Sequence, residues 1–578
     1  MRVGIDLGST YSGFARYDYA NDRVEPITFR EGDPFSIPSV VYITSKGAPL
    51  TGNTAKNKTS SKLGRRFEYF KMLLNEKDEA IVRSRGYDDK YTPREITKIF
   101  LEKHLEAALN VYNESRIENL CICVPEIWST GLQTLDGRSI LREILQETDV
   151  PIDHIQVVTE PEAASAYFAY NYEIETKKSF NGYLLLIDYG GGTLDITLTE
   201  IVSSGKGNME ICYREGCGAG ENHVDSYGNK IVGDAGVAYI QNLVLHAIRN
   251  SGEFDDDISF TDPKFISAVL DFESSIKSHE KMSEIESYFG TFGTYSDFEE
   301  VLNSSPEDFA EFEYCDSVIT VTYQDLYRVY KETIEPVLLK QVNQINDKVR
   351  DLIKDDPCKP SSGNKDNFKI ALVGGFSGCF FVKAQLYEIY NMDANLKNDP
   401  RIKNISTNKK EQAISLGAAL LAADKVRLQK TSRYSIGLYA SDANKKFRPF
   451  YGIKYHQSII PGKPYFMLHD DSKPDEPSNR VVYSNLAGIK QFIIEFSGDL
   501  NSGGLMNLNS EMLDRLKDLP AIQFWNCGFS MDDSGVISFH ILPRGEENTS
   551  LGRTIKLDSY SNMFDLTAVK EVKVNEIR

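Results

Sequence analysis

One short pattern occurs twice in this chain of 578 residues, and it limits the possible folds more than any other feature. Residues 4–13 read GIDLGSTYSG, and residues 186–195 read LIDYGGGTLD. Each is an apolar run that ends in Asp and is followed by glycine and a hydroxyl residue, which predicts a strand that enters a hairpin turn. We interpret the repeat as a duplicated fold with two similar phosphate-binding loops, with chance similarity as the alternative.

The two turns have the residue types that a metal-bound triphosphate needs. Glycine lets backbone N–H groups approach phosphates closely, and carboxylates hold Mg²⁺ directly or through its waters. The candidate phosphate ligands are Gly8, Ser9 and Thr10 in the first turn and Gly190, Gly191, Gly192 and Thr193 in the second. The candidate metal ligands are Asp6, Asp188 and Asp195. Either turn alone is more typical of an ordinary hairpin, but together they predict a clamp around the phosphates.

Residues 157–168, VVTEPEAASAYF, add a carboxylate to this site. The pattern predicts a strand that ends at Thr159 and a helix that begins near Pro161, with alanines that allow close packing. Glu160 at this junction is a candidate for orienting or deprotonating the attacking water. The plainer interpretation is a helix-start carboxylate that the helix dipole favours.

Residues 370–386 predict a strand, a turn at Gly374 and Gly375, and a helix. Such a turn lets backbone lie against an adenine or a ribose, although it also fits many strand–helix units. Further alternation of helices and strands, including a capping box at Thr92 and one long helix over residues 323–352, predicts an α/β fold. We interpret the acidic, aromatic stretch 252–314 as a solvated peripheral insertion, with a partner-binding surface as the alternative.

Composition excludes several classes of protein. The formal net charge of −19 argues against a nucleic-acid partner. No segment approaches the roughly 20 apolar residues that span a bilayer, and no signal for export is present. We therefore expect no membrane partner. The eight cysteines have no CxxC spacing, so we expect free thiols and a cytoplasmic location.

In this order the motifs resemble the actin-like ATPase superfamily and, within it, the heat-shock 70 kDa (DnaK-type) chaperone family. The resemblance covers residues 1 to about 424 and closes with ISLGAALLA at 414–422. FKMLL at 70–74, VPEIW at 124–128 and TEPEAASAY at 159–167 are most similar to the atypical branch labelled member 12. The implied fold class is α/β: a duplicated actin-like (ribonuclease H-type) ATPase domain of two lobes, then a mostly β, sandwich-like domain.

The resemblance also implies a division of the chain. The expected parts are a nucleotide-binding domain at 1–424 (lobe I at about 1–180, lobe II at about 181–370 with a peripheral insertion at 224–356, and a closing segment at 370–424), a linker at 425–433 and a β-rich domain at 434–578. MDDSGVISFHI at 531–541 resembles a strand of the family's β-sandwich. We expect no helical lid after it.

The resemblance assigns roles to the site residues. It implies that Asp6 and Asp188 hold Mg²⁺, that Glu160 and Asp195 act near the attacking water, and that Thr193 contacts the γ-phosphate. The residues that it places along the phosphates, sugar and adenosine are Ser9, Thr10, Tyr11, Gly218, Gly220, Glu221, Glu273, Lys277, Gly374 and Gly375.

Two positions and the linker depart from the family pattern. An ungapped match puts Ser60 where the family has its catalytic lysine; Lys62 and Lys71 are the alternatives, and the FKM pattern favours Lys71. Gly378 stands where the family has an adenine-stacking arginine. The linker, KVRLQKTSRY, lacks the family's apolar, acidic signature. We therefore expect slow hydrolysis and leave adenine preference and coupling between domains open.

The expected function is a conformational switch or chaperone that binds ATP or ADP with Mg²⁺. Its β-rich domain is expected to bind a peptide or protein client. A co-chaperone or nucleotide-exchange factor is a further expected partner. The alternatives are a small-molecule kinase on the same fold and a nucleotide-dependent filament-forming scaffold.

Overall fold

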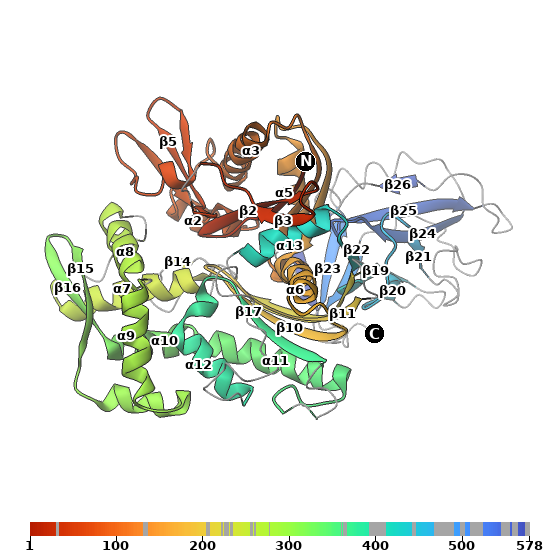
Figure 1. Ribbon diagram of the computed structural model, residues 1–578. Coiled ribbons are helices and arrows are strands. Elements are labelled where there is room, and N and C mark those ends of the chain that lie inside the picture. The colour runs from red at the N-terminus through yellow and green to blue at the C-terminus, as the bar shows by residue number, and fades with distance from the viewer. Residues whose placement is uncertain are drawn as a thin grey trace.

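The computed structural model shows a mixed α/β protein, which confirms the expected class (Figure 1). It describes residues 1–578 except 31–33, 131–136, 204–208, 221–222, 225–229, 232–234, 255–257, 259, 261, 277, 360, 362–366, 392–411, 442–446, 468–490, 497–502, 509–523, 545–554, 558–563 and 573–578. Among the helices of these described ranges, none is both long and apolar enough to cross a membrane.

The first sheet contains the first of the two repeated segments. Its strands are β1 (Arg2–Asp6), β2 (Tyr11–Asp18), β3 (Arg23–Pro26), β4 (Ser36–Pro38), β8 (Ile117–Val124) and β9 (Ile152–Thr159). The order is β3-β2-β1-β8-β9, and β4 pairs with β2. β1 runs antiparallel to β2 and parallel to β8.

The second sheet repeats this arrangement. Its strands are β10 (Gly182–Tyr189), β11 (Leu194–Ser203), β12 (Met209–Ala219), β17 (Phe368–Val373) and β18 (Val426–Gln429). The order is β17-β10-β11-β12-β18, with β10 antiparallel to β11 and parallel to β17. The sequence repeat thus corresponds to the same hairpin, with the same parallel neighbour, in each sheet.

Two helices lie between the sheets: α6 (Glu160–Thr176) packs on the second sheet, and α13 (Ala413–Ala422) packs on β1 of the first (Figure 1). They cross at very short range, because a Cβ on Gly417 would lie 1.7 Å from the carbonyl oxygen of Ala163. Gly4 is equally constrained, since its Cβ would lie 2.1 Å from the backbone nitrogen of Ala419. The small residues of both helices therefore set the spacing between the sheets, as the alanines at 163–166 predicted.

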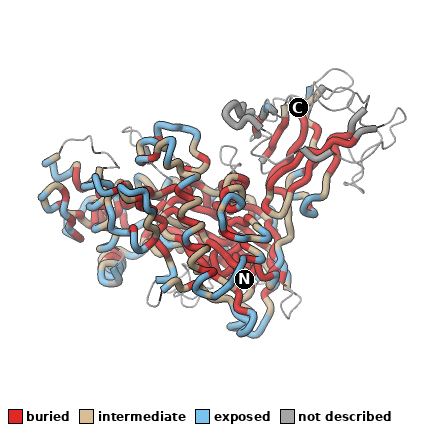
Figure 2. Tube along the Cα trace, turned by 90° about the horizontal axis from the view of Figure 1, so that it is seen from above, coloured by how far each residue is buried: buried red, intermediate tan, exposed pale blue. Residues whose placement is uncertain are grey.

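Buried residues gather in the middle of the chain (Figure 2). Of the other helices, α5 (Gly137–Gln146) packs on the first sheet and α11 (Glu335–Ile353) on the second, whereas α8 (Pro263–Ile276) and α9 (His279–Gly290) lie away from both (Figure 1). The remaining helices are α1 (Phe70–Leu73), α2 (Glu79–Ser84), α3 (Pro93–Tyr112), α4 (Ile127–Thr130), α7 (Gly236–Ser251), α10 (Tyr323–Thr333) and α12 (Phe380–Ile389). The prediction of one helix over 323–352 is wrong: α10 and α11 are separate helices because Pro336 stands in the first turn of α11.

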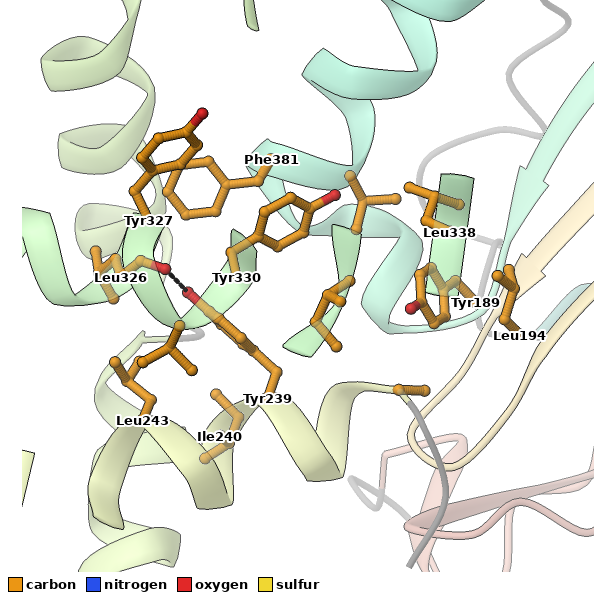
Figure 3. Close-up of a cluster of buried hydrophobic side chains, with 14 of the residues drawn as sticks. Tyr189, Leu194, Tyr239, Ile240, Leu243, Leu326, Tyr327, Tyr330, Leu338 and Phe381 are labelled. Atoms are coloured by element: carbon orange, nitrogen blue, oxygen red, sulfur yellow. Dashed lines mark hydrogen bonds between the residues drawn. The ribbon is translucent and has the colours of Figure 1, made fainter. Parts of the chain in front are cut away.

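The core beside the second sheet is rich in tyrosine and phenylalanine (Figure 3). Tyrosine hydroxyls find partners inside this core, as where Tyr239 Oη donates to the carbonyl of Leu326 at 3.0 Å. The acidic stretch 252–314 adds Phe265, Phe272 and Phe298 to this core, each at most 1% exposed. The prediction of a merely solvated insertion is therefore wrong for its aromatic residues.

Smaller sheets complete the part before residue 426. Their strands are β5 (Val40–Thr44), β6 (Pro49–Thr51) and β7 (Gly64–Glu68), then β13 (His223–Val224) with β14 (Lys230–Ile231), and β15 (Asp308–Tyr314) with β16 (Ser317–Thr322).

From Tyr434 onward all the elements in the described part of the chain are strands, in two sheets ordered β20-β19-β22-β23-β27 and β21-β24-β25-β26. Their bounds are β19 (Tyr434–Ser441), β20 (Phe447–Ile453), β21 (Tyr465–Phe466), β22 (Gln491–Phe496), β23 (Gly503–Leu508), β24 (Phe524–Met531), β25 (Ile537–Arg544), β26 (Ile555–Leu557) and β27 (Phe564–Val572). Four residues of the predicted linker form β18, which pairs with β12.

Candidate functional site

The two glycine-rich turns lie against each other. A Cβ on Gly191 would be 2.6 Å from Thr10 Oγ1, and a Cβ on Gly192 would be 2.6 Å from Ser9 Oγ. These contacts leave no room for side chains at the two glycines. The structure therefore brings together the turn residues that the sequence predicted as one site.

The three predicted aspartates lie at the same end of their sheets as these turns. Asp188 and Asp195 are directly opposite each other in the β10–β11 hairpin, and they are 3% and 0% exposed. Asp6, at the end of β1, occupies the matching place beside the first turn. Asp195 is held from outside the hairpin by the backbone N–H of Glu126, which donates to Asp195 Oδ1 at 2.8 Å.

A buried ion pair crosses this end of the first sheet. Lys71 on α1 donates to the Oε1 oxygen of Glu160, and the two side chains are 2% and 7% exposed. Glu160 is the first residue of α6, directly after the Thr159 N-cap, and so lies at the strand–helix junction that the sequence predicted. Lys62 is exposed on the surface. Of the two alternative lysines, the structure places Lys71 in the site.

The electrostatics show an excess of negative charge. Burial, and next the charge of Glu160, raise the pKa of Asp6 to about 7. Burial and the neighbouring carboxylates also raise the pKa values of Asp188 and Asp195 well above the usual range. Burial lowers the pKa of Lys71, but the charges of Glu160 and Asp6 outweigh it, so that the pKa is raised. One ammonium therefore faces four carboxyl groups, and a further cation would relieve their repulsion.

The donor set fits Mg²⁺ as the resemblance implies. Asp188 Oδ2 and Asp195 Oδ2 are buried and accept no hydrogen bond in the described part of the chain. Within the same described residues, no group of three acidic, His or Cys side chains is placed to hold a metal ion by itself. Mg²⁺ usually keeps several waters and binds through one or two carboxylates plus substrate phosphates, so an open set of this kind suits it.

The remaining predicted ligands fall into two groups. Gly218 and Gly220 at the end of β12 lie beside the second hairpin, with Cβ positions 2.9 Å from Asp195 Oδ1 and 2.7 Å from Thr193 Cγ2. Gly374 has a φ of +81°, and its Cβ would lie 2.3 Å from Asp188 Oδ1, so the turn after β17 reaches the same carboxylate. Gly375 has open space around its Cβ position.

Tyr11 begins β2, directly after the first turn, and its backbone oxygen would lie 1.8 Å from a Cβ on Gly8. Glu273 on α8 lies near Tyr69, whose pKa its charge helps to raise, after the larger effect of burial. Glu221 and Lys277 lie outside the described residues.

Two residues of the site were not predicted from the sequence. Glu126 is fully buried and contributes the N–H that holds Asp195. Tyr69 has a left-handed backbone with a φ of 60° before α1, and its hydroxyl oxygen accepts a hydrogen bond from Gln241 Nε2 at 3.3 Å. Glu126 lies in VPEIW, and Tyr69 directly precedes FKMLL, but no local pattern shows which distant partner either residue meets.

Comparison with known proteins agrees with this geometry. Residues 2–216 match the family model described as Hsp70 protein. This segment is Hsp70-like. The match begins in β1 and ends in β12, so it includes both glycine-rich turns, Lys71 and Glu160, and excludes the turn at Gly374.

A curated relative gives the same result. Heat shock cognate 70 kDa protein 3 of Dictyostelium discoideum is 28% identical over 259 residues, which are 40% of this chain and 38% of that protein. The chain thus matches about two fifths of the relative's length. Together the two matches confirm the resemblance to an Hsp70-type actin-like ATPase.

Proposed function

We propose that this chain is an Mg²⁺-dependent, slowly hydrolysing ATPase that works as an Hsp70-like conformational switch. Hsp70-type homologues are ATPases, and the segment that resembles them contains the paired turns. The observation that supports the proposal most strongly is the buried Lys71–Glu160 ion pair beside Asp6, Asp188 and Asp195, where the two turns meet. An ordinary pair of hairpin turns does not need five buried or half-buried charges at one point.

Each charged group has a definite task in this proposal. Asp6 and Asp188 would hold the metal, which supplies charge neutralisation at the phosphates. Glu160 orients the attacking water, and Asp195, fixed by the N–H of Glu126, assists it. Lys71 stabilises negative charge that develops on the γ-phosphate, and Thr193 donates a hydrogen bond to it. Since Lys71 is bound to Glu160, it must exchange this partner for phosphate, which agrees with slow turnover.

The proposal includes a division of the chain into two lobes at about 1–180 and 181–370, a closing segment to 424, and a separate sandwich-like domain from 434. The edges of the sheets in this last domain would bind an extended peptide or a protein client. The proposal also places the chain in the member-12-type branch. Support comes from the repeated sheet topology and from the all-strand character of the described residues after 434.

Calorimetry with Mg-ATP tests the proposal. Asp188→Ala should weaken binding by at least about tenfold, because it removes a carboxylate with a free, buried oxygen. Asp153→Ala, at an exposed position of β9, is the matched control and should bind like the wild type. Equal affinity of all three proteins would remove Asp188 from the site, and no binding by the wild type would refute an ATP-binding function.

Two assays separate the alternative functions. ATP consumption that depends on an added polyol would favour the small-molecule kinase. Pelleting that depends on nucleotide would favour the filament-forming scaffold.

A further inference from the structure

A second charged region lies where the chain passes from β18 to β19. A cavity of about 40 Å³ opens there between α4, α5, the start of α6 and the β24–β25 turn. Its lining residues with charged side chains are Arg138, Glu162, Lys430 and Arg433. Three cations and one carboxylate thus surround the cavity. Its volume exceeds the roughly 10–15 Å³ that holds one water molecule.

The carboxylate of Glu162 is already fully engaged. Its Oε1 oxygen pairs with Arg433 Nη2 at 2.9 Å. Its Oε2 oxygen accepts from the backbone N–H and the hydroxyl of Thr159 at 2.9 and 3.2 Å, in the capping box of α6. Arg433 also lies 3.3 Å from Glu126 through Nε. Both carboxylates therefore form their ion pairs with Arg433. The charge of Glu162 also acts on Arg138 and Lys430, but in the described part of the chain it forms no ion pair with either of them.

Arg138 is 8% exposed and has neutral partners. Its Nε donates to Ser129 Oγ at 3.0 Å, and its Nη1 donates to the carbonyls of Val157 and Ser534 at 3.4 and 3.0 Å. Within the described part of the chain, Nη2 makes no hydrogen bond. A buried guanidinium without an anionic partner is costly, so its free donors favour an anion.

Lys430 is the third cation. Among the described residues, its ammonium has no hydrogen bond and no carboxylate within 4.0 Å. Asp533 lies near enough for its charge to act on Lys430, but the two form no ion pair in the described ranges. The neighbouring Asp532 is paired with Arg142 and accepts from the N–H groups of Ser534 and Val536. Neither aspartate therefore satisfies the ammonium.

We propose that this cavity binds a free, small oxyanion of the phosphate or sulfate type. An ammonium and a guanidinium with an unused Nη2 line it, and such donors are the ones that bind phosphate in proteins. The volume admits a group of a few heavy atoms and excludes a nucleotide or a peptide side chain with its backbone. This site does not depend on the proposed ATPase function, because none of its residues belongs to the phosphate turns.

The cavity contains its own reporter, since Trp128 lines it and is 2% exposed. The chain has two tryptophans, so Trp525→Phe leaves Trp128 as the single tryptophan, which excitation at the red edge of its absorption selects over tyrosine. We would titrate this full-length variant with sodium phosphate and with sodium sulfate, using sodium chloride to hold the ionic strength constant. Saturable changes in Trp128 fluorescence are expected with both oxyanions.

Three variants in the Trp525→Phe background test the assignment. Lys430→Gln should weaken oxyanion binding by at least about tenfold, because it removes a charged donor, whereas Lys430→Arg should retain most of it. Lys178→Gln, at an exposed position beyond the far end of α6, should bind like the parent protein. Circular dichroism establishes that each variant is folded, and the rescue by Lys430→Arg distinguishes lost charge from damaged structure.

The titrations are repeated with saturating Mg-ADP. Binding that persists and still depends on Lys430 supports the proposal, whereas loss of the signal would place the anion in the nucleotide site and overturn it. Fluorescence changes that chloride reproduces, or that are equal in Lys430→Gln and Lys178→Gln, would also overturn it. Failure of ADP to bind would refute the proposed ATPase function. Oxyanion binding by the Lys430→Gln, Lys430→Arg and Lys178→Gln variants would then decide the present proposal.

Discussion

Replacement of Glu162 by Gln should reduce stability in a way that depends on pH. Burial opposes the charged form of Glu162, but Arg433, Lys430, Arg138 and the Thr159 N–H outweigh it and lower its pKa from 4.5 to about 2. This difference corresponds to about 3 kcal/mol of folding free energy at about 1.4 kcal/mol per pH unit. Because the folded-state pKa is the lower one, the stabilisation is fully present above about pH 4.5 and is lost as the pH falls towards 2.

Equilibrium urea unfolding at pH 7 and pH 3 measures this effect. Glu162→Gln should lose about 3 kcal/mol at pH 7 and roughly half as much at pH 3. Glu175→Gln, at an exposed position of the same helix, should change the free energy of unfolding by less than about 0.5 kcal/mol at either pH. An equal loss at both values of pH would refute the electrostatic reasoning and assign the effect to the hydrogen bonds of the capping box.

Two further predictions concern the site and the packing behind it. Glu160→Gln should keep its affinity for nucleotide and slow turnover by about 10²- to 10⁴-fold in a steady-state ATPase assay, and normal turnover would remove Glu160 from catalysis. Gly417→Ala should lower the free energy of unfolding by about 1–3 kcal/mol or more, because its Cβ would lie 1.7 Å from the Ala163 carbonyl. Gly290→Ala, in open space at the end of α9, should be neutral or stabilising by up to about 1 kcal/mol, and equal effects of the two would contradict the close helix crossing.

Local sequence predicted those parts of the site that one short segment contains. The turn at Gly8, the aspartate at the end of each strand and the change from strand to helix after Thr159 depend on residues next to one another, so their pattern is visible without the fold. The prediction of a single helix over 323–352 was wrong for a local reason too: the helical spacing continues across Pro336, but proline has no N–H to donate to the preceding turn.

The choice between Lys62 and Lys71 shows the limit of that reasoning. Both are lysines close to the position of the family's catalytic lysine. The sequence pattern favoured Lys71 but did not decide between the two. The β5–β7 sheet leaves Lys62 exposed, whereas the following α1 turns Lys71 towards Glu160, 89 residues further along the chain. A contact over this separation depends on how β9 and α6 are placed, which no window of sequence contains.

The sequence by itself determined the repeated hairpins, the order of the motifs and the mixed α/β class, because each follows from hydrophobic period and turn chemistry over a few residues. Tertiary structure decided which charges meet. Arg433 reaches Glu162 and Glu126 only because β18 joins the second sheet and directs the chain past the start of α6. The energies of buried charges depend on burial and on distances between remote residues, and these exist only after the sheets and helices have packed.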